Sequence, residues 1–153
     1  MFRMPSGIAG EVTRKENAVI EPNILGADMA FGSPGKLSNG KLVNIEAGDT
    51  AADVYGYLAR PYPTQGGALG LTSDGKLTAG NACDVLRLGY LNVNLARGDA
   101  AKGGAVYLRV AAVTGKAVGD LETAAIAEET VALPATFMGP ADANGITEIA
   151  VKL

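Results

Sequence analysis

The chain has 153 residues, of which 48% are hydrophobic and 19% charged, as in a single folded domain rather than a disordered segment. It contains no His, no Trp and one Cys. These absences exclude an internal disulfide, a structural zinc site of Cys and His, and any catalytic scheme that uses imidazole. The formal net charge is −3, with 13 Lys and Arg against 16 Asp and Glu and no basic stripe, so we expect no nucleic-acid partner.

Hydropathy and the single cysteine indicate where the chain folds. No apolar run approaches the roughly 18 residues that span a bilayer, and the first residues have no signal-peptide core, so we expect no membrane partner. One cysteine without a secretory signal is typical of a protein made in a reducing cytoplasm. Cys83 stands at the start of a predicted strand, and we expect it to be a small packing residue.

Residues 1–36 differ from the rest of the chain. They hold three prolines and five glycines, and their apolar residues follow neither a period of 2 nor one of 3.6. A disordered linker would contain fewer Ile and Val residues. We therefore expect residues 1–36 to form an extended N-terminal arm whose apolar side chains pack against the chain's own β domain, residues 37–153, or against a neighbouring subunit.

Turn signals and β-prone runs follow from about residue 37. Asn39-Gly40 favours a type I′ turn, which predicts a hairpin between residues 36–38 and 41–46. A second β-prone run, residues 54–58, stops before Pro61, and Asp74-Gly75 is another turn signal.

Residues 84–95 predict a bent strand. Leu91, Val93 and Leu95 share one face, whereas the two leucines just before Gly89 are one residue out of that register. A glycine inside a strand often marks a bulge, so a shift at Gly89 explains both halves.

The last third of the chain continues the strand pattern. In residues 105–110, Val106, Leu108 and Val110 alternate with Tyr107 and Arg109, as in a half-buried strand. Residues 121–127 fit a helical turn or a strand, and residues 130–133 and 149–153 favour strands. The predicted fold class is therefore mainly β: a compact β-barrel or β-sandwich, jelly-roll-like, with an extended N-terminal arm.

Motifs that carry chemistry are weak. No motif pairs two carboxylates as a glycosidase requires, and the Gly-rich residues 66–70 lack the Lys-Ser/Thr of a phosphate loop. Residues 142–145 resemble part of a calcium loop but lack its further ligands, so they favour a plain Asx turn. The five tyrosines, residues 55, 57, 62, 90 and 107, leave a carbohydrate- or ligand-binding module open, although core or interface positions are commoner for strand aromatics. We expect no catalytic residue, no metal and no cofactor.

Segments along nearly the whole chain resemble one family. The matching segments are residues 4–14, 18–22, 49–63, 85–90, 101–110 and 141–150. In this order they resemble the structural cement, or head-decoration, proteins of tailed bacteriophages. These motifs are structural rather than catalytic.

The resemblance implies a function. Such a protein binds the outer surface of the icosahedral head, clamps neighbouring major capsid subunits and stabilises the shell, without an active site or cofactor. It implies two partners, the major capsid protein and the protein itself, as a homotrimer with a dimer as the alternative. The expected location is the capsid exterior of the virion, after synthesis in the bacterial host cytoplasm. Another phage structural role, such as a tail-tube or adaptor protein, and a ligand-binding β module remain open, and an enzyme is the least favoured class.

The arm and the proline-rich loop supply the candidate interface residues. An apolar segment without periodicity needs a partner surface, and Arg and Tyr are enriched at interface hot spots. The candidate capsid or subunit interface consists of Ile8, Glu11, Val12, Arg14, Val19, Ile20, Pro22, Arg60 and Tyr62.

Overall fold

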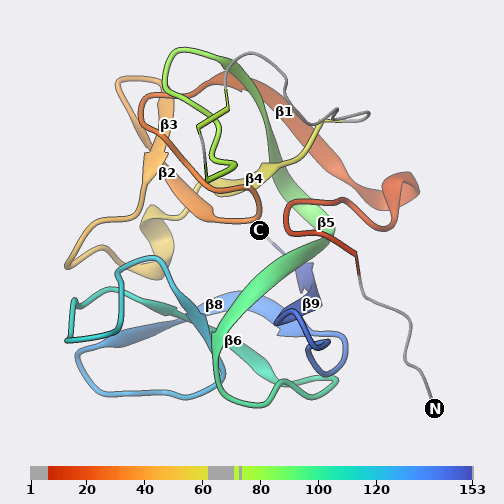
Figure 1. The fold of residues 1–153 in the computed structure, drawn as a ribbon, viewed down its shortest axis with the longest axis vertical. Coiled ribbons are helices and arrows are strands. Elements are labelled where there is room, and N and C mark those ends of the chain that lie inside the picture. Colours follow the sequence, from red (N-terminus) through yellow and green to blue (C-terminus); the bar gives the residue numbers. More distant parts are fainter. Residues whose placement is uncertain (1–6, 62–70, 73, 153) are drawn as a thin grey trace.

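The computed structural model describes residues 7–61, 71, 72 and 74–152, and these fold mainly into strands (Figure 1). The strands are β1 (Val19–Ile24), β2 (Pro34–Ser38), β3 (Lys41–Asn44), β4 (Gly56–Ala59), β5 (Ala82–Arg97), β6 (Ala105–Arg109), β7 (Leu121–Glu122), β8 (Thr130–Phe137) and β9 (Ile146–Val151). Two 3-10 helices, η1 (Lys15–Asn17) and η2 (Ala51–Asp53), are the helical elements of the described ranges, and neither has the length or apolar run needed to cross a membrane. The mainly β class is confirmed.

Two lobes share the long strand β5, which runs through both of them in Figure 1. In the sheet lobe, the first half of β5 lies between β4 and β1, and β2 and β3 extend the sheet beyond β4. In the barrel lobe, β5, β7, β6, β8 and β9 pair in succession and β9 returns to β5, which closes a barrel. The barrel alternative of the expected fold is therefore confirmed.

The predicted bend in β5 lies where the strand passes from one lobe to the other. Gly89 has a φ of +133°, which glycine adopts readily. A Cβ at this position would lie 3.1 Å from Ala18 Cα, because the N-terminal segment crosses β5 here. The register with β1 skips Arg87 between Leu86 and Leu88, so the irregularity lies two residues before Gly89. The bent strand is confirmed.

Local turn chemistry also agrees with the sequence. Asn39 and Gly40 both have positive φ, +50° and +76°, and join β2 to β3 as a hairpin. The Asp142 Oδ1 accepts hydrogen bonds from the backbone N–H groups of Asn144 and Ile146 at 2.8 and 3.0 Å, which is the expected Asx turn. Residues 121–127, for which helix and strand were both open, begin as the short strand β7.

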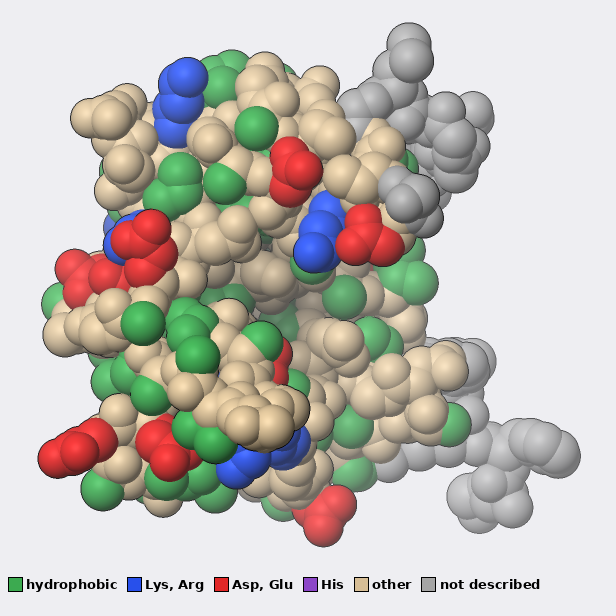
Figure 2. All heavy atoms as spheres, turned by 60° about the vertical axis from the view of Figure 1, so that its left-hand side comes forward, with side chains coloured by type: hydrophobic (Ala, Val, Ile, Leu, Met, Phe, Trp, Pro, Cys, Tyr) green, Lys and Arg blue, Asp and Glu red, His purple; other side chains and the backbone are tan. Residues whose placement is uncertain are grey.

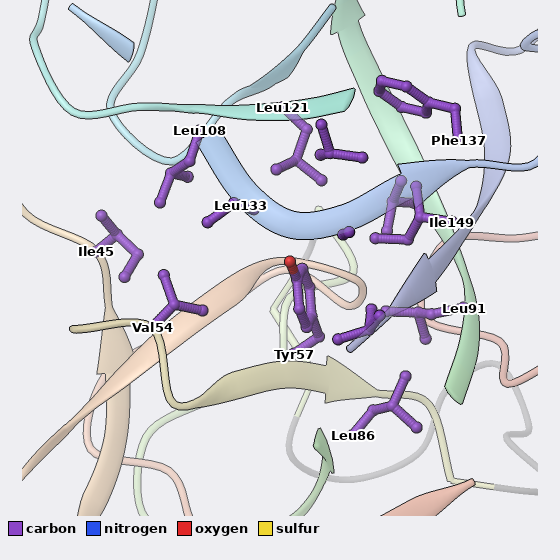
Figure 3. Close-up of a cluster of buried hydrophobic side chains, with 14 of the residues drawn as sticks. Ile45, Val54, Tyr57, Leu86, Leu91, Leu108, Leu121, Leu133, Phe137 and Ile149 are labelled. Atoms are coloured by element: carbon purple, nitrogen blue, oxygen red, sulfur yellow. The ribbon is translucent and has the colours of Figure 1, made fainter. Parts of the chain in front are cut away.

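Two hydrophobic clusters hold the lobes together. The larger one fills the barrel and the space below the sheet lobe, and Figure 3 shows its side chains converging from several strands. Tyr57 is 1% exposed among them, and burial raises the pKa of its hydroxyl. The smaller cluster lies in the sheet lobe and includes Cys83, which packs there as expected, and burial raises the pKa of its thiol.

The segment expected to form an arm is divided between the core and the surface. Leu25, Met29 and Phe31 are buried in the smaller cluster, β1 pairs along β5, and β2 crosses the expected boundary between residues 36 and 37. Other apolar residues of the segment remain exposed by 42–52%: Ile8, Val19, Ile20 and Ile24. Part of this segment thus belongs to the fold, while the rest presents apolar surface.

A buried ionic cluster lies outside the barrel wall. Arg109, which the alternation of β6 places on the polar face of a half-buried strand, is 0% exposed because loops cover that face. Its guanidinium donates to both carboxylate oxygens of Glu122, at 3.0 and 3.2 Å, and to Glu129 at 2.7 Å. Arg97 joins the cluster through Asp120 and Glu122, at 2.8 and 2.9 Å. On the face shown in Figure 2, some Lys and Arg side chains also lie beside Asp or Glu, whereas others stand apart from any acidic side chain.

Candidate functional site

The N-terminal segment, residues 7–18, lies beside β5 before it crosses to β1. Backbone N–H groups of Gly10 and Thr13 donate to the carbonyls of Asn92 and Tyr90, at 2.8 and 3.2 Å. In return, the Asn92 N–H donates to the carbonyl of Glu11 at 2.9 Å. The segment is therefore fixed to the barrel lobe like a short extra strand, and the crossing at Gly89 then leads it to the opposite side of β5.

A groove of about 700 Å³ lies between this segment and the sheet lobe. Its apolar lining comes from Ile8, Val12, Ile20, Ala59 and Pro61. Its charged lining comes from Glu11, Lys15, Arg60 and Asp84. The groove thus combines residues from the N-terminal segment, β1, β4 and β5, which only the tertiary fold brings together.

One end of the groove is held in place by Arg60. The guanidinium lies 4.3 Å from the centre of the Phe31 ring, and its Nε donates to the carbonyl of Ala9 at 3.4 Å. Burial lowers the pKa of Arg60, and the nearby Glu11 carboxylate opposes this shift. An arginine remains charged under these conditions, so this end of the groove carries a fixed cation.

Asp84 lies in the lining of the groove, in the middle of a three-stranded part of the sheet. It pairs with Ala59 of β4 on one side and with Pro22 of β1 on the other. Its side chain is half-buried, and its carboxylate forms no hydrogen bond or ion pair with any residue that the structure describes. Within the described ranges, Asp84 is therefore a half-buried charge without a partner.

The surface along β1 continues the groove. Ile20 and Ile24 are exposed by 42% and 43%, and they lie on the same face of the strand as the exposed Pro22. The free edge is poorly suited to strand addition, because Pro22 has no N–H and the Ile24 N–H is taken by the side chain of Asn23 at 2.6 Å. Contacts here therefore favour side chains over backbone pairing.

The predicted interface residues fall into two sets. Five line the groove: Ile8, Glu11, Val12, Ile20 and Arg60. Val19 and Pro22 lie nearby on β1, opposite Leu88 and Asp84. Tyr62 lies outside the described residues.

Arg14 lies apart from the groove on the barrel lobe. Its guanidinium is 4.1 Å from the centre of the Tyr90 ring and 3.2 Å from a carboxylate oxygen of Glu148, which also accepts a hydrogen bond from the Thr13 hydroxyl. The structure thus gives Arg14 a role in fixing the N-terminal segment to the barrel.

Sequence reasoning missed five lining residues: Gly7, Lys15, Ala59, Pro61 and Asp84. The only signal for Asp84 was a charge within a β-prone run, and this does not tell which face the residue occupies. No group of three or more His, Cys, Asp or Glu side chains that could hold a metal occurs among the described residues.

Comparisons with known proteins place the chain in a family. The sequence model of the XM1 gp53 minor capsid protein family matches residues 1–151. A solved chain from the capsid of Myoviridae phage XM1 has a similar fold, with a TM-score of 0.74 and 16% identity over 98% of this chain and 92% of that chain. A comparison with curated proteins finds no match. Because the family match spans nearly its whole length, the chain belongs to the XM1 gp53 minor capsid protein family and is a structural protein of the phage virion.

Proposed function

We propose that the protein is a cement protein, which binds the outer surface of the phage head and clamps neighbouring major capsid subunits. Family membership supports an association with the capsid. The observation that carries the finer proposal is the apolar surface around the groove, where Ile8 and Ile20 stay exposed by 52% and 42%. Exposed apolar residues gathered at a groove are typical of a protein-binding site.

The energetics suit binding to a repeating lattice. Covering an Ile side chain that is about half exposed contributes on the order of 1 kcal/mol, so the groove and β1 supply only a few kcal/mol. The groove walls are already ordered by backbone bonds and by Arg60, which lowers the entropic cost of docking. A modest contact repeated by linked copies gains from avidity. In this proposal the protein acts through contact alone, and the homotrimer or dimer stays a prediction.

The test of groove docking compares two substitutions on empty heads that lack the protein. Ile20→Glu places a charge in the groove, and Val113→Glu places the same charge in the loop between β6 and β7. Both side chains are 42% exposed, so the two variants are matched. We expect Ile20→Glu to weaken binding to the heads by about tenfold or more, because a carboxylate would be buried against apolar surface.

The control should bind like the unchanged protein. Equal binding by Ile20→Glu, or equal losses in both variants, would remove the groove from the interface. Substitutions are preferable to a deletion of residues 4–25, because that deletion would also remove β1 from the sheet. The cement role itself is tested by heating or osmotically shocking decorated and undecorated heads: decorated heads should survive longer, and equal fragility contradicts the proposal.

A further inference from the structure

We propose that the groove binds a lysine or arginine side chain of the capsid shell, and that Asp84 supplies its counter-charge. This deepens the proposed function and rests on it: the shell is the partner, and the groove is the surface that contacts it.

The first step is that the Asp84 carboxylate is placed unfavourably in the free protein. A carboxylate placed mid-strand and half-buried loses hydration, and this is unfavourable unless hydrogen bonds or an opposite charge compensate. Arg60 lines the same groove, yet the ion pairs found between described residues do not include Asp84. Nothing in the described part of the fold uses this charge.

The second step is the shape and chemistry of the groove. Its lining is partly apolar, with Ile8, Val12 and Ile20, and partly charged, with two cations and two carboxylates, one of which is Asp84. The other carboxylate, Glu11, lies near the cation Arg60 and opposes its charge. A side chain with an apolar stem and a cationic tip matches both features, and lysine and arginine are the side chains of that kind. A purely apolar side chain would bury the Asp84 charge without a partner, and an acidic one would be repelled by it.

The third step is the source of the cation. The chain belongs to a family of minor capsid proteins, and the capsid shell is therefore the partner that we consider first. A second copy is a poorer donor, because at least six of the Lys and Arg residues in the described ranges already form internal ion pairs. We therefore assign the cation to the shell and treat a second copy as an outcome of the test.

The experiment measures binding of Asp84→Asn to empty heads that lack the protein, across a range of salt concentrations. We expect its affinity to fall by about tenfold or more, the loss typical of one charge-assisted contact, and its dependence on salt to become weaker. The melting temperature of the free protein should stay equal or rise, because the removed charge has no partner among the residues that the structure describes. Asp99→Asn is the matched control: Asp99 is exposed beyond the end of β5 and should leave binding and melting unchanged.

The other outcomes distinguish a failure of the proposed function from a failure of the present inference. If the unchanged protein fails to bind the heads, the proposed function fails; if it binds and Asp84→Asn binds equally well, only the present inference is overturned. A lower melting temperature for Asp84→Asn would show an internal role and would also overturn it. The inference would also be overturned if Asp84→Asn lost self-association, measured by sedimentation, without a direct loss of binding to heads. The groove would then hold a second copy of the chain. The charge reversal Asp84→Lys gives an independent check, since it should abolish binding while the chain remains folded.

Discussion

Arg109 and Asp84 both carry charge on strands of the same protein, but their surroundings differ. Arg109 is fully buried and donates to two carboxylates, those of Glu122 and Glu129. Asp84 is half-buried beside an open groove, and its carboxylate has no partner among the described residues. The difference separates two uses of a buried charge: the first holds the protein's own loops in place, whereas the second is arranged for a molecule outside the fold.

The barrel wall and the groove are also held together by different interactions. Arg109 lies on β6, and its partners come from β7 and from the loop before β8, so one side chain fastens two later segments to the barrel wall. The groove end is assembled by backbone pairing and apolar contact instead. A change in charge should therefore affect folding at the barrel and binding at the groove.

The largest effect is expected from Arg109→Met. The substitution keeps an apolar stem but removes the cation that pairs with Glu129 and one of the two that pair with the buried Glu122, whose remaining partner is Arg97; this is strongly destabilising. We expect the melting temperature, followed by circular dichroism, to fall on the order of 10 °C. An unchanged melting temperature would show that the ionic cluster around Arg109 does not hold the loops. Arg109 would then not differ from Asp84 in its contribution to stability.

A smaller, pH-dependent effect is expected from Glu129. The hydrogen bond from Arg109 lowers the pKa of the Glu129 carboxyl in the folded protein. A carboxyl whose pKa is lower when folded stabilises the protein at neutral pH, and this contribution is lost as the pH falls through its ordinary range, from about 5 to 3.

Glu129→Gln removes this titration. We therefore expect its free energy of unfolding, measured in urea, to change less steeply over that pH range than that of the unchanged protein. Identical slopes for the two proteins would contradict the assignment of the Arg109–Glu129 pair.

The smallest effect on stability is expected for a substitution of Asp84. Because Asp84 has no partner in the described part of the chain, Asp84→Asn should melt at the same temperature as the unchanged protein or slightly above it, by about 2 °C at most. Asp99→Asn serves as the reference for an exposed carboxylate. A clear loss of stability in Asp84→Asn alone would place Asp84 in the same class as Arg109.

The parts of the fold that depend on local chemistry could be predicted from the sequence. The Asn39-Gly40 hairpin and the Asp142 turn follow from residues that favour those backbone conformations. The bend at Gly89 follows from a break in alternation, which is visible within a dozen residues.

The remainder depends on partners distant in sequence. Arg109 alternates with apolar neighbours like a surface residue, and only loops that end near Glu129, 20 residues later, bury it. Among residues 1–36, Leu25 and Ile20 have the same chemistry, but Leu25 enters the core and Ile20 stays exposed because of how β1 lies on β5. The groove joins residues 8–20 to 59–61 and 84, and no local pattern links these stretches.

Electron cryomicroscopy of decorated heads tests the central claim most directly. We expect the groove to face the shell and to hold a lysine or arginine of a major capsid subunit, with its nitrogen within hydrogen-bond distance of the Asp84 carboxylate. A groove that faces solvent, or one filled by a second copy of the chain, would contradict it.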